Sequence, residues 1–280
     1  MGLADLLRDV TEGSGSGALL PHIEQGFARK GTKPPLKNNS YLRASGIPSL
    51  CPREEVLCAV EDITRPDNID AGLNLTFLHG TSLHWGVQNH LLGPLGVLYG
   101  TWECLSCKKK FGEQQEGVRA EDWSVPRPKV CDCGHKDFNF VEASFVDHDL
   151  RLTGHSDGFL VLPGLPGMGI LEVKSIGSRY AKEIKVAPQL AHMIQAHVYM
   201  MFTGFKWAKI LYWQKGETGL GALVEHHIDR DEETIRRIQD TIRSVWAGVA
   251  LKSLPDRICA NDSCTRARAC PVSTKCFNAK

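Results

Sequence analysis

Three side chains that could perform metal-assisted chemistry lie close together in the sequence, namely Asp157, Glu172 and Lys174. Glu172 and Lys174 alternate with Val173, so in a β-strand they point to the same side while Val173 points into the core. Two converging carboxylates repel each other unless a hard cation such as Mg²⁺ or Mn²⁺ binds their oxygens, and a neighbouring lysine can orient or deprotonate an attacking water. The pattern is short, and the alternative is a surface hairpin whose outward face carries Asp, Glu and Lys.

The elements that would position these side chains follow from the apolar pattern. Apolar runs at 159–162 and 169–171 flank a turn at 163–167 that is rich in proline and glycine. Such a pattern predicts a β-hairpin. Asp157 would stand at the start of its first arm and Glu172 at the end of its second, so the two acids can converge.

A helix is expected upstream of the hairpin, over residues 75–92, with Gly80 and His84 one turn apart on it. A single helical histidine is usually a satisfied interior or surface residue. Here the glycine would let the helix pass close to another backbone and leave the imidazole room to reach a metal.

Downstream, Pro188 opens a helix that is expected to end near Phe202. His192, Gln195 and Tyr199 share one face of it, and a polar face usually points to solvent. The order of elements predicts an α/β fold with a mixed sheet covered by helices. The other elements predicted for this fold are strands at 140–146, 208–213 and 223–228 and an amphipathic helix at 231–249.

Ten cysteines are many for a chain of 280 residues, and in a reducing compartment they favour metal ligation over disulfides. Two close pairs, Cys104 with Cys107 and Cys131 with Cys133, are separated by a polar loop. This arrangement is typical of a tetrahedral zinc ribbon, which would form an insertion over residues 101–140. The second pair is C-x-C, so His135 is an alternative ligand. A zinc held by cysteines alone has no open position for catalysis, so the ribbon would be structural.

The composition sets broad limits on the class of protein. The chain is 42% hydrophobic with a net charge of +1, so it can bury a large core and has no global basic field that would attract nucleic acid. No apolar run approaches membrane-spanning length and the N-terminus lacks the layout of a signal peptide. We therefore expect a cytoplasmic protein with no membrane partner. Residues 1–40 are expected to form an N-terminal helix and a flexible linker.

Four short motifs follow one another in the chain: GTSLH at 80–84, GHSDG at 154–158, EVK at 172–174 and QAHVY at 195–199. In this order they resemble the motifs G-x-x-x-H, G-x-x-D, E-x-K and Q-x-x-x-Y of RecB-like nucleases in the PD-(D/E)XK superfamily. The proline that the superfamily carries before the aspartate is Ser156 here. The resemblance implies that residues 41–280 form a PD-(D/E)XK nuclease domain, with a mixed central sheet flanked by helices.

The resemblance also implies an activity and a role for each site residue. The protein would be an Mg²⁺- or Mn²⁺-dependent deoxyribonuclease, acting as an exonuclease on DNA ends or single-stranded DNA. His84, Asp157, Glu172 and the Val173 carbonyl would bind the cation, and Lys174 would position or activate the attacking water. Gln195 and Tyr199 would hold the scissile strand.

The outer cysteines extend the resemblance. CRISPR-associated and AddB-type members of this group carry one cysteine before the nuclease motifs and three after them, which ligate a 4Fe-4S cluster. Cys51 resembles the first, and Cys270 and Cys276 resemble the end of a C-terminal group at 257–280. For the remaining place Cys259 is favoured, at an apolar-to-loop transition, over Cys264, which lies in a polar stretch that reads as an exposed turn. The cluster would join the two ends of the domain.

The zinc ribbon departs from the compact CRISPR-associated form. It suggests a phage-encoded or mobile-element relative, in the host cytoplasm, that works on DNA with recombination, repair or replication proteins. A CRISPR adaptation nuclease remains an alternative. A hypothesis of another class is a DNA-binding or scaffold protein that uses the ribbon while its nuclease core is idle. The intact set of acids disfavours this hypothesis, because carboxylates that are buried together without a ligand destabilise the fold.

Overall fold

The structure, a computed structural model, describes residues 41–63, 65, 70–115 and 117–278, and four isolated positions before them (19, 23, 25 and 26). The predicted N-terminal helix and linker over 1–40 otherwise lie outside the described residues. The chain divides into two compact units, Met1–Lys37 with Thr64–His79, and Asn38–Ile63 with Gly80–Lys280. Helix α4 (Ala71–Gly86) crosses the division, and its first turn is capped by the Asp70 carboxylate, which accepts the Leu73 N–H at 2.7 Å. Within the described part of the chain, no helix is both long and apolar enough to cross a membrane.

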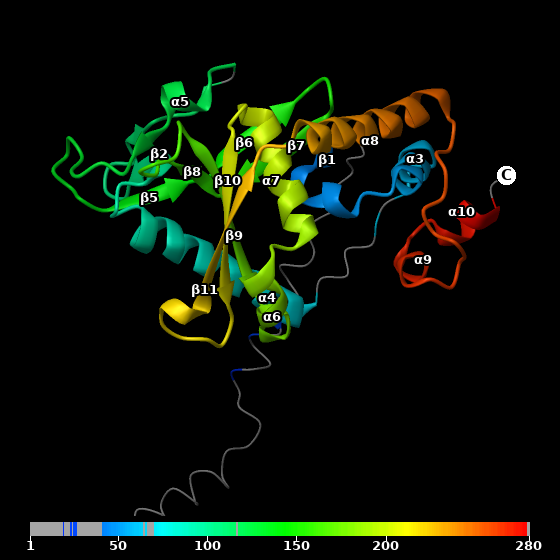
Figure 1. Ribbon diagram of the computed structural model, residues 1–280, viewed down its shortest axis with the longest axis horizontal. Coiled ribbons are helices and arrows are strands. Elements are labelled where there is room, and N and C mark those ends of the chain that lie inside the picture. The colour runs from blue at the N-terminus through cyan, green and yellow to red at the C-terminus, as the bar shows by residue number, and fades with distance from the viewer. Residues whose placement is uncertain are drawn as a thin grey trace, which may run out of the picture. The chain divides into compact units, whose positions relative to one another are not determined.

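The large unit is built on a mixed sheet with strand order β11-β10-β9-β8-β2-β3. Strands β9 and β10 are parallel, and the neighbours along the rest of the order are antiparallel. Figure 1 shows β9 and β10 through the centre of this unit, with β2, β5 and β8 to one side. The strands are β2 (Leu98–Cys104), β3 (Lys110–Phe111), β8 (Gly158–Leu160), β9 (Gly169–Ile176), β10 (Trp207–Gln214) and β11 (Leu223–Asp229). The α/β class expected from the sequence is confirmed.

The predicted hairpin is the β8–β9 pair, in which Phe159 lies opposite Ile170 and Leu160 opposite Gly169. Gly169 is required there, because a Cβ would lie 2.2 Å from Cε3 of the Trp207 ring. That ring is buried, and its Nε1 donates to the Pro166 carbonyl at 2.8 Å. The glycine therefore lets Trp207 fasten the turn of the hairpin to the sheet.

The prediction of a single strand over 140–146 is wrong, because the structure has two strands there, in different sheets. Strand β5 (Phe138–Val141) pairs with β2, whereas β6 (Ala143–Asp147) pairs with β7 (Leu152–Ser156) in a small sheet of order β1-β7-β6. Strand β1 is Leu42–Arg43. Glu142 is the one residue between the two strands, so it stands where the chain passes from one sheet to the other.

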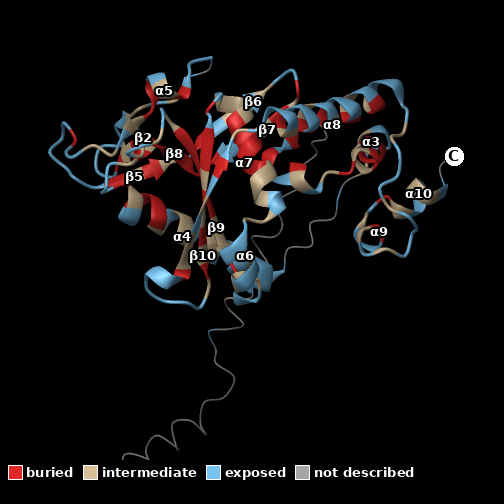
Figure 2. Ribbon diagram, viewed as in Figure 1, coloured by how far each residue is buried: buried red, intermediate tan, exposed pale blue. Residues whose placement is uncertain are grey.

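The helices cover the sheets largely as expected. Helix α7 (Leu190–Thr203) packs against β9 and β10, and α8 (Glu232–Leu251) packs against α3 (Pro52–Val60). Figure 2 shows the buried residues concentrated in the central strands and in α7. The α4 helix continues as a π-helical turn, η2 (Val87–Leu92), so the helix expected over 75–92 is one continuous element. The segment after β9 forms η3 (Ser178–Tyr180) and α6 (Ala181–Val186).

The cysteine-bearing segment is continuous with the large sheet. Its first strand, β2, pairs with β8 at Leu98 and Tyr99 and with β5 and β3 at its far end. The segment also contains α5 (Ala120–Trp123) and β4 (Val125–Pro126). The C-terminal part has α9 (Thr265–Ala269) and α10 (Ser273–Asn278). The short 3-10 helices η1 (Ala44–Ser49) and η4 (Leu220–Ala222) are the other elements among the described residues.

Candidate active site

Asp157 occupies the point where the chain leaves the small sheet for the large one, between β7 and β8. Gly158 makes this passage possible, because its φ of 144° is a region that other residues rarely adopt. A Cβ at Gly158 would also lie 2.5 Å from Leu98 Cδ1. The turn aims the Asp157 carboxylate at β9, where Oδ2 accepts the Val173 N–H at 2.6 Å. The G-x-x-D and E-x-K segments thus meet through a direct hydrogen bond.

Glu172 and Lys174 lie on the same side of β9, as the alternation predicts, with Lys174 Nζ 2.5 Å from Glu172 Oε1. Glu172 is only 2% exposed. Its Oε2 is buried, and no described residue hydrogen-bonds to it. Burial, together with the negative charge of Asp157, raises the pKa of Glu172 to about 7, against the opposing effect of Lys174. For Lys174 burial disfavours the charged form, but the carboxylates of Glu172 and Asp157 outweigh burial and raise its pKa.

His84 reaches the same place from α4. Its Nδ1 lies 2.9 Å from Asp157 Oδ1. Burial lowers the pKa of His84, but the hydrogen bond to Asp157 and the surrounding carboxylates reverse the effect and raise it. Gly80, one turn earlier, is not required for this approach, since a Cβ there would lie 3.5 Å from Ser175 Oγ, which is an ordinary van der Waals contact.

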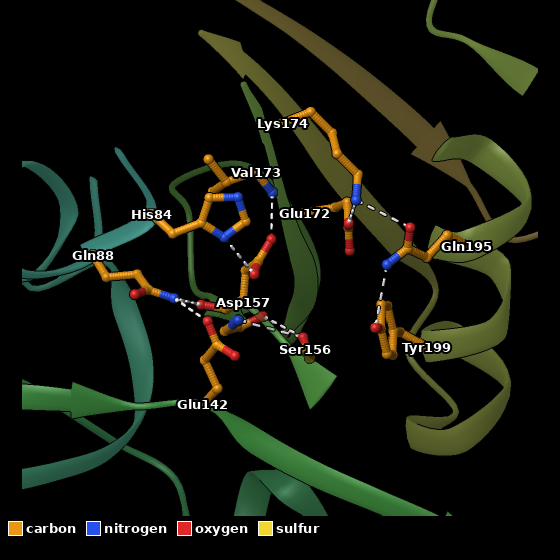
Figure 3. Close-up of polar contacts among 11 residues, drawn as sticks. His84, Gln88, Glu142, Ser156, Asp157, Glu172, Val173, Lys174, Gln195 and Tyr199 are labelled. Atoms are coloured by element: carbon orange, nitrogen blue, oxygen red, sulfur yellow. Dashed lines mark hydrogen bonds and ion pairs between the residues drawn. The ribbon is translucent and has the colours of Figure 1, made fainter. Parts of the chain in front are cut away.

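Gln195 and Tyr199 are buried, so the face of α7 that carries them does not point to solvent. Lys174 Nζ donates to Gln195 Oε1 at 3.0 Å, and Gln195 Nε2 donates to Tyr199 Oη at 3.3 Å (Figure 3). Burial raises the pKa of Tyr199, so its phenol stays protonated. Gly154 leaves room for this ring, because a Cβ there would lie 3.1 Å from Tyr199 Cε1. The third residue of that face, His192, bonds instead to Tyr212 Oη, at 2.9 Å from Nδ1.

Glu142 belongs to this site, although the sequence motifs do not include it. Its carboxylate forms a group with His84 and Asp157 whose possible ligand atoms all lie within 4.8 Å of one another. Gln88 ties it in place, since Nε2 donates to Glu142 Oε1 at 3.4 Å and to the Asp157 carbonyl at 2.9 Å. Burial and the charge of Asp157 raise the pKa of Glu142. The signal that could have revealed it is strand register: Ala143 pairs with Ser156, so the next residues outward, Glu142 and Asp157, are neighbours.

The four cysteines of the predicted ribbon come together. Their Sγ atoms all lie within 4.8 Å of one another, with Cys107 Sγ 3.5 Å from Cys131 Sγ and Cys104 Sγ 3.7 Å from Cys133 Sγ. Backbone N–H groups, that of Cys107 first, lower the pKa of Cys104 to about 6 against the effect of burial, and so favour the thiolate there. At Cys131 a backbone hydrogen bond from Cys133 is outweighed by burial and the neighbouring thiols, which raise the pKa to about 12. His135 is absent from this group; its carbonyl accepts the Cys131 N–H at 2.8 Å.

The outer cysteines line a hollow at the C-terminal end of the large unit. Cys51, Cys259, Cys270 and Cys276 are all on its wall, and Cys264 is not. Cys264 caps α9, where its Sγ accepts the Ala267 N–H at 3.4 Å, and its thiol is also hydrogen-bonded to that of Cys259. Arg53 of α3 binds the C-terminal segment through donation to the Cys276 carbonyl at 3.3 Å. The two ends of this unit are therefore joined around the hollow.

No protein-family model matches the sequence, and no curated protein matches it. Among solved structures the chain is similar to an alkaline exonuclease, LHK-Exo from Laribacter hongkongensis, at 12% identity over 76% of this chain and 90% of that chain, with a TM-score of 0.46. It is also similar to the protein SSO0001, at 14% identity over 92% of this chain and 99% of that one, with a TM-score of 0.40.

A phage-related exonuclease from Haemophilus somnus 129PT is similar at 14% identity over 39% of this chain and 59% of that chain, with a TM-score of 0.30. LHK-Exo has also been solved in complex with dAMP. TM-scores below 0.5 establish neither a shared fold nor a shared activity, so we base the function of this chain on the geometry of its own site.

Proposed function

We propose that this protein is a metal-dependent deoxyribonuclease that degrades DNA from its ends. The observation that carries the proposal is the buried Glu172 carboxylate, with one oxygen on Lys174 and the other without a described partner, facing Asp157 across the hairpin. Burying such an oxygen without a partner costs free energy, which a bound ligand can recover. The nearby donors are carboxylate oxygens and an imidazole, a set that suits Mg²⁺ or Mn²⁺.

Asp157, Glu172 and the Val173 carbonyl would hold the cation, with His84 as a further ligand. When bound, the cation offsets the charge that develops on the phosphate during hydrolysis. Lys174 Nζ would orient the attacking water and assist its deprotonation. Gln195 accepts a hydrogen bond from Lys174 and donates one to Tyr199. These two residues would therefore hold the lysine in place as well as contacting the scissile DNA strand. In the sequence-based hypothesis they served only to hold DNA.

Two features support DNA as the substrate. The four ordered motifs resemble those of RecB-like nucleases, and exposed basic side chains follow the site directly, namely Arg179, Lys182 and Lys185 on η3 and α6. Cationic side chains beside a cation site attract a phosphate backbone without reading its sequence. We place the activity in DNA recombination, repair or replication, in a phage-encoded or mobile-element relative, because the cysteine-bearing insertion departs from the compact CRISPR-associated form.

The cysteines would hold two further metal centres of structural type. Cys104, Cys107, Cys131 and Cys133 converge closely enough for one zinc with no open position. Cys51, Cys259, Cys270 and Cys276 line one hollow and would hold a 4Fe-4S cluster, which requires four thiolates around a larger body than one ion. Zinc and iron analysis of protein purified without chelator, with absorbance spectra taken anaerobically, tests both assignments.

The activity is tested on end-labelled single-stranded and double-stranded DNA, linear and circular, with Mg²⁺, Mn²⁺ or EDTA. We expect mononucleotides or short products from linear DNA, intact circles, and no cleavage in EDTA. Glu172→Gln and Lys174→Ala should abolish cleavage, while Glu217→Gln, which changes an exposed acid of the β10–β11 turn, should not. Cleavage of circles would make the enzyme an endonuclease. DNA binding without any cleavage would favour a DNA-binding protein with an idle core.

A further inference from the structure

His192 lies on α7 one turn before Gln195, and Gln195 accepts the hydrogen bond from Lys174. The proposed function gives His192 no part. Its Nδ1 lies 2.9 Å from Tyr212 Oη. Tyr212 is the partner of Lys174 in the parallel register of β10 with β9, so the two side chains project from the same side of the sheet. His192 and Tyr212 therefore lie beside the lysine of the candidate active site.

The hydrogen bonds of Tyr212 determine which nitrogen of His192 carries the proton. The Tyr212 side chain is buried, and its Oη accepts the Gln189 N–H at 3.0 Å. Burial raises the pKa of Tyr212, so the phenol keeps its own proton. Among the residues that the structure describes, the acceptor for this proton is His192 Nδ1. A buried phenol without an acceptor would be destabilising, so Nδ1 accepts and the hydrogen of the imidazole is on Nε2.

The imidazole of His192 is neutral, and its Nε2–H is open to solvent. Burial, and then the positive charge of Lys174, lower the pKa of His192 to about 4. In the described part of the chain nothing bonds to Nε2, yet this atom is not one of the buried polar atoms that lack a partner. An atom that is neither bonded nor buried is in contact with water. The Lys174 side chain is itself 22% exposed, so a ligand from solvent can reach both groups.

A segment with an excess of lysines lies on the same side of the sheet. His226 of β11 stands edge-on to Tyr212, with ring centroids 5.9 Å apart, and its Nε2 donates to the backbone of α6 at 2.6 Å. Helix α6 is thereby held close to the Tyr212–His192 pair. Its exposed charged side chains are Lys182, Glu183 and Lys185. An anion bound at the His192 N–H would therefore lie near a net positive charge.

We propose that His192 is a DNA-binding residue whose Nε2–H donates to a non-bridging oxygen of the phosphate next to the scissile one, and that Tyr212 positions it. The proposal rests on the proposed function and adds a contact to it. Lys174 and the cation occupy the scissile phosphate, so His192, one turn farther along α7, meets the neighbouring phosphate. A charged phosphate oxygen is a strong acceptor for an N–H. A neutral donor suits this place, because a second cation would repel Lys174.

The test compares wild type with His192→Asn on single-stranded oligonucleotides in which one phosphate at a time, counted from each end, is a methylphosphonate. This group lacks the charge and one acceptor oxygen of the phosphate. His192→Asn keeps an acceptor for Tyr212 near the position of Nδ1 but has no donor at that of Nε2, so it should fold. Cleavage with Mn²⁺ gives KM and kcat, and fluorescence anisotropy in Ca²⁺ gives Kd. His227→Asn, which changes an exposed histidine of β11, is the matched control.

On unmodified DNA, His192→Asn should raise KM and Kd by about tenfold with little change in kcat. At one position beside the scissile phosphate, the methylphosphonate should weaken wild type by a similar factor and the variant hardly at all, because the same bond cannot be lost twice. His192→Gln, whose amide can place a donor near the position of Nε2, should recover part of the affinity. Tyr212→Phe should raise KM and reduce the dependence on that one phosphate, and His227→Asn should match wild type.

Two results overturn the contact while leaving the nuclease assignment intact. One is an unchanged KM and Kd in His192→Asn, and the other is a methylphosphonate effect that is as large in the variant as in wild type at every position. Wild-type protein that cleaves no DNA, but shows the dependence of His192 on one phosphate in Kd, overturns the proposed function and leaves the phosphate contact standing.

Discussion

Without divalent cations, the folded protein should lose stability as its site ionises near neutral pH. Glu172 is buried, and its pKa is about 7 in the folded protein against a usual value of 4.5. The folded state therefore holds the proton more tightly than the unfolded chain does. The stabilisation from this group is complete below about pH 4.5, and it is lost as pH rises through about 7.

The magnitude follows from the difference between the two pKa values of Glu172. At about 1.36 kcal/mol per pH unit, a rise from 4.5 to about 7 lowers the free energy of unfolding by on the order of 3 kcal/mol across that window. His84 and Glu142, whose pKa values are also raised, act in the same direction. The contribution of Glu172 must therefore be isolated by comparison with a variant that cannot ionise there.

Urea unfolding of wild type and Glu172→Gln at pH 5, 6, 7 and 7.5 in EDTA makes this comparison. The variant should be the less pH-dependent of the two, so that the wild type loses stability relative to it as pH rises. Saturating Mn²⁺ should remove most of the wild-type loss, because a cation stabilises the ionised carboxylate. A difference between the two proteins that stays constant over this pH range would refute the burial of an unpaired acid at Glu172.

Three further predictions concern the surroundings of the site. Asn89→Ala removes the acceptor of the buried Phe140 N–H, bonded at 2.8 Å, and should lower the free energy of unfolding by about 1–3 kcal/mol in urea titrations; an unchanged midpoint would contradict this. Replacing Cys104 and Cys107 with serine should remove zinc in metal analysis and also reduce cleavage, whereas full activity in zinc-free protein would show that the ribbon is independent of the site. Cys51→Ser and Cys259→Ser should lose the visible absorbance of the cluster while Cys264→Ser keeps it, and the reverse pattern would transfer the ligand role to Cys264.

Local patterns predicted much of the fold. The hairpin of β8 and β9 follows from apolar runs around a Pro/Gly turn, and the start of α8 follows from Asp231, whose carboxylate accepts the Glu233 and Thr234 N–H groups. Each of these signals is contained within a few neighbouring residues. The same is true of Glu172 and Lys174, whose common side of the strand depends only on the alternation of side chains.

Features that depend on pairing between distant segments were missed. Residues 140–146 read as one strand because no glycine or proline interrupts them, yet β5 pairs with β2 and β6 pairs with β7. Glu142 lies at this break, so its place beside Asp157 follows only once both partners are known. The buried state of Gln195 was also missed, since it depends on α7 packing against β9 and on a bond to Lys174.

The cysteine-bearing ribbon and the candidate active site are connected through β5 and the α4–η2 helix. Strand β5 runs from the second cysteine pair to Glu142, and Asn89 and Trp85 of the α4–η2 helix bond to it, Trp85 through Asn139 Oδ1 at 2.9 Å. That same helix carries His84, and its Gln88 holds Glu142 and the Asp157 carbonyl. A metal that fixes β5 therefore fixes both the strand that delivers Glu142 and the helix that delivers His84. A zinc centre without an open position can in this way be necessary for a reaction in which it takes no chemical part.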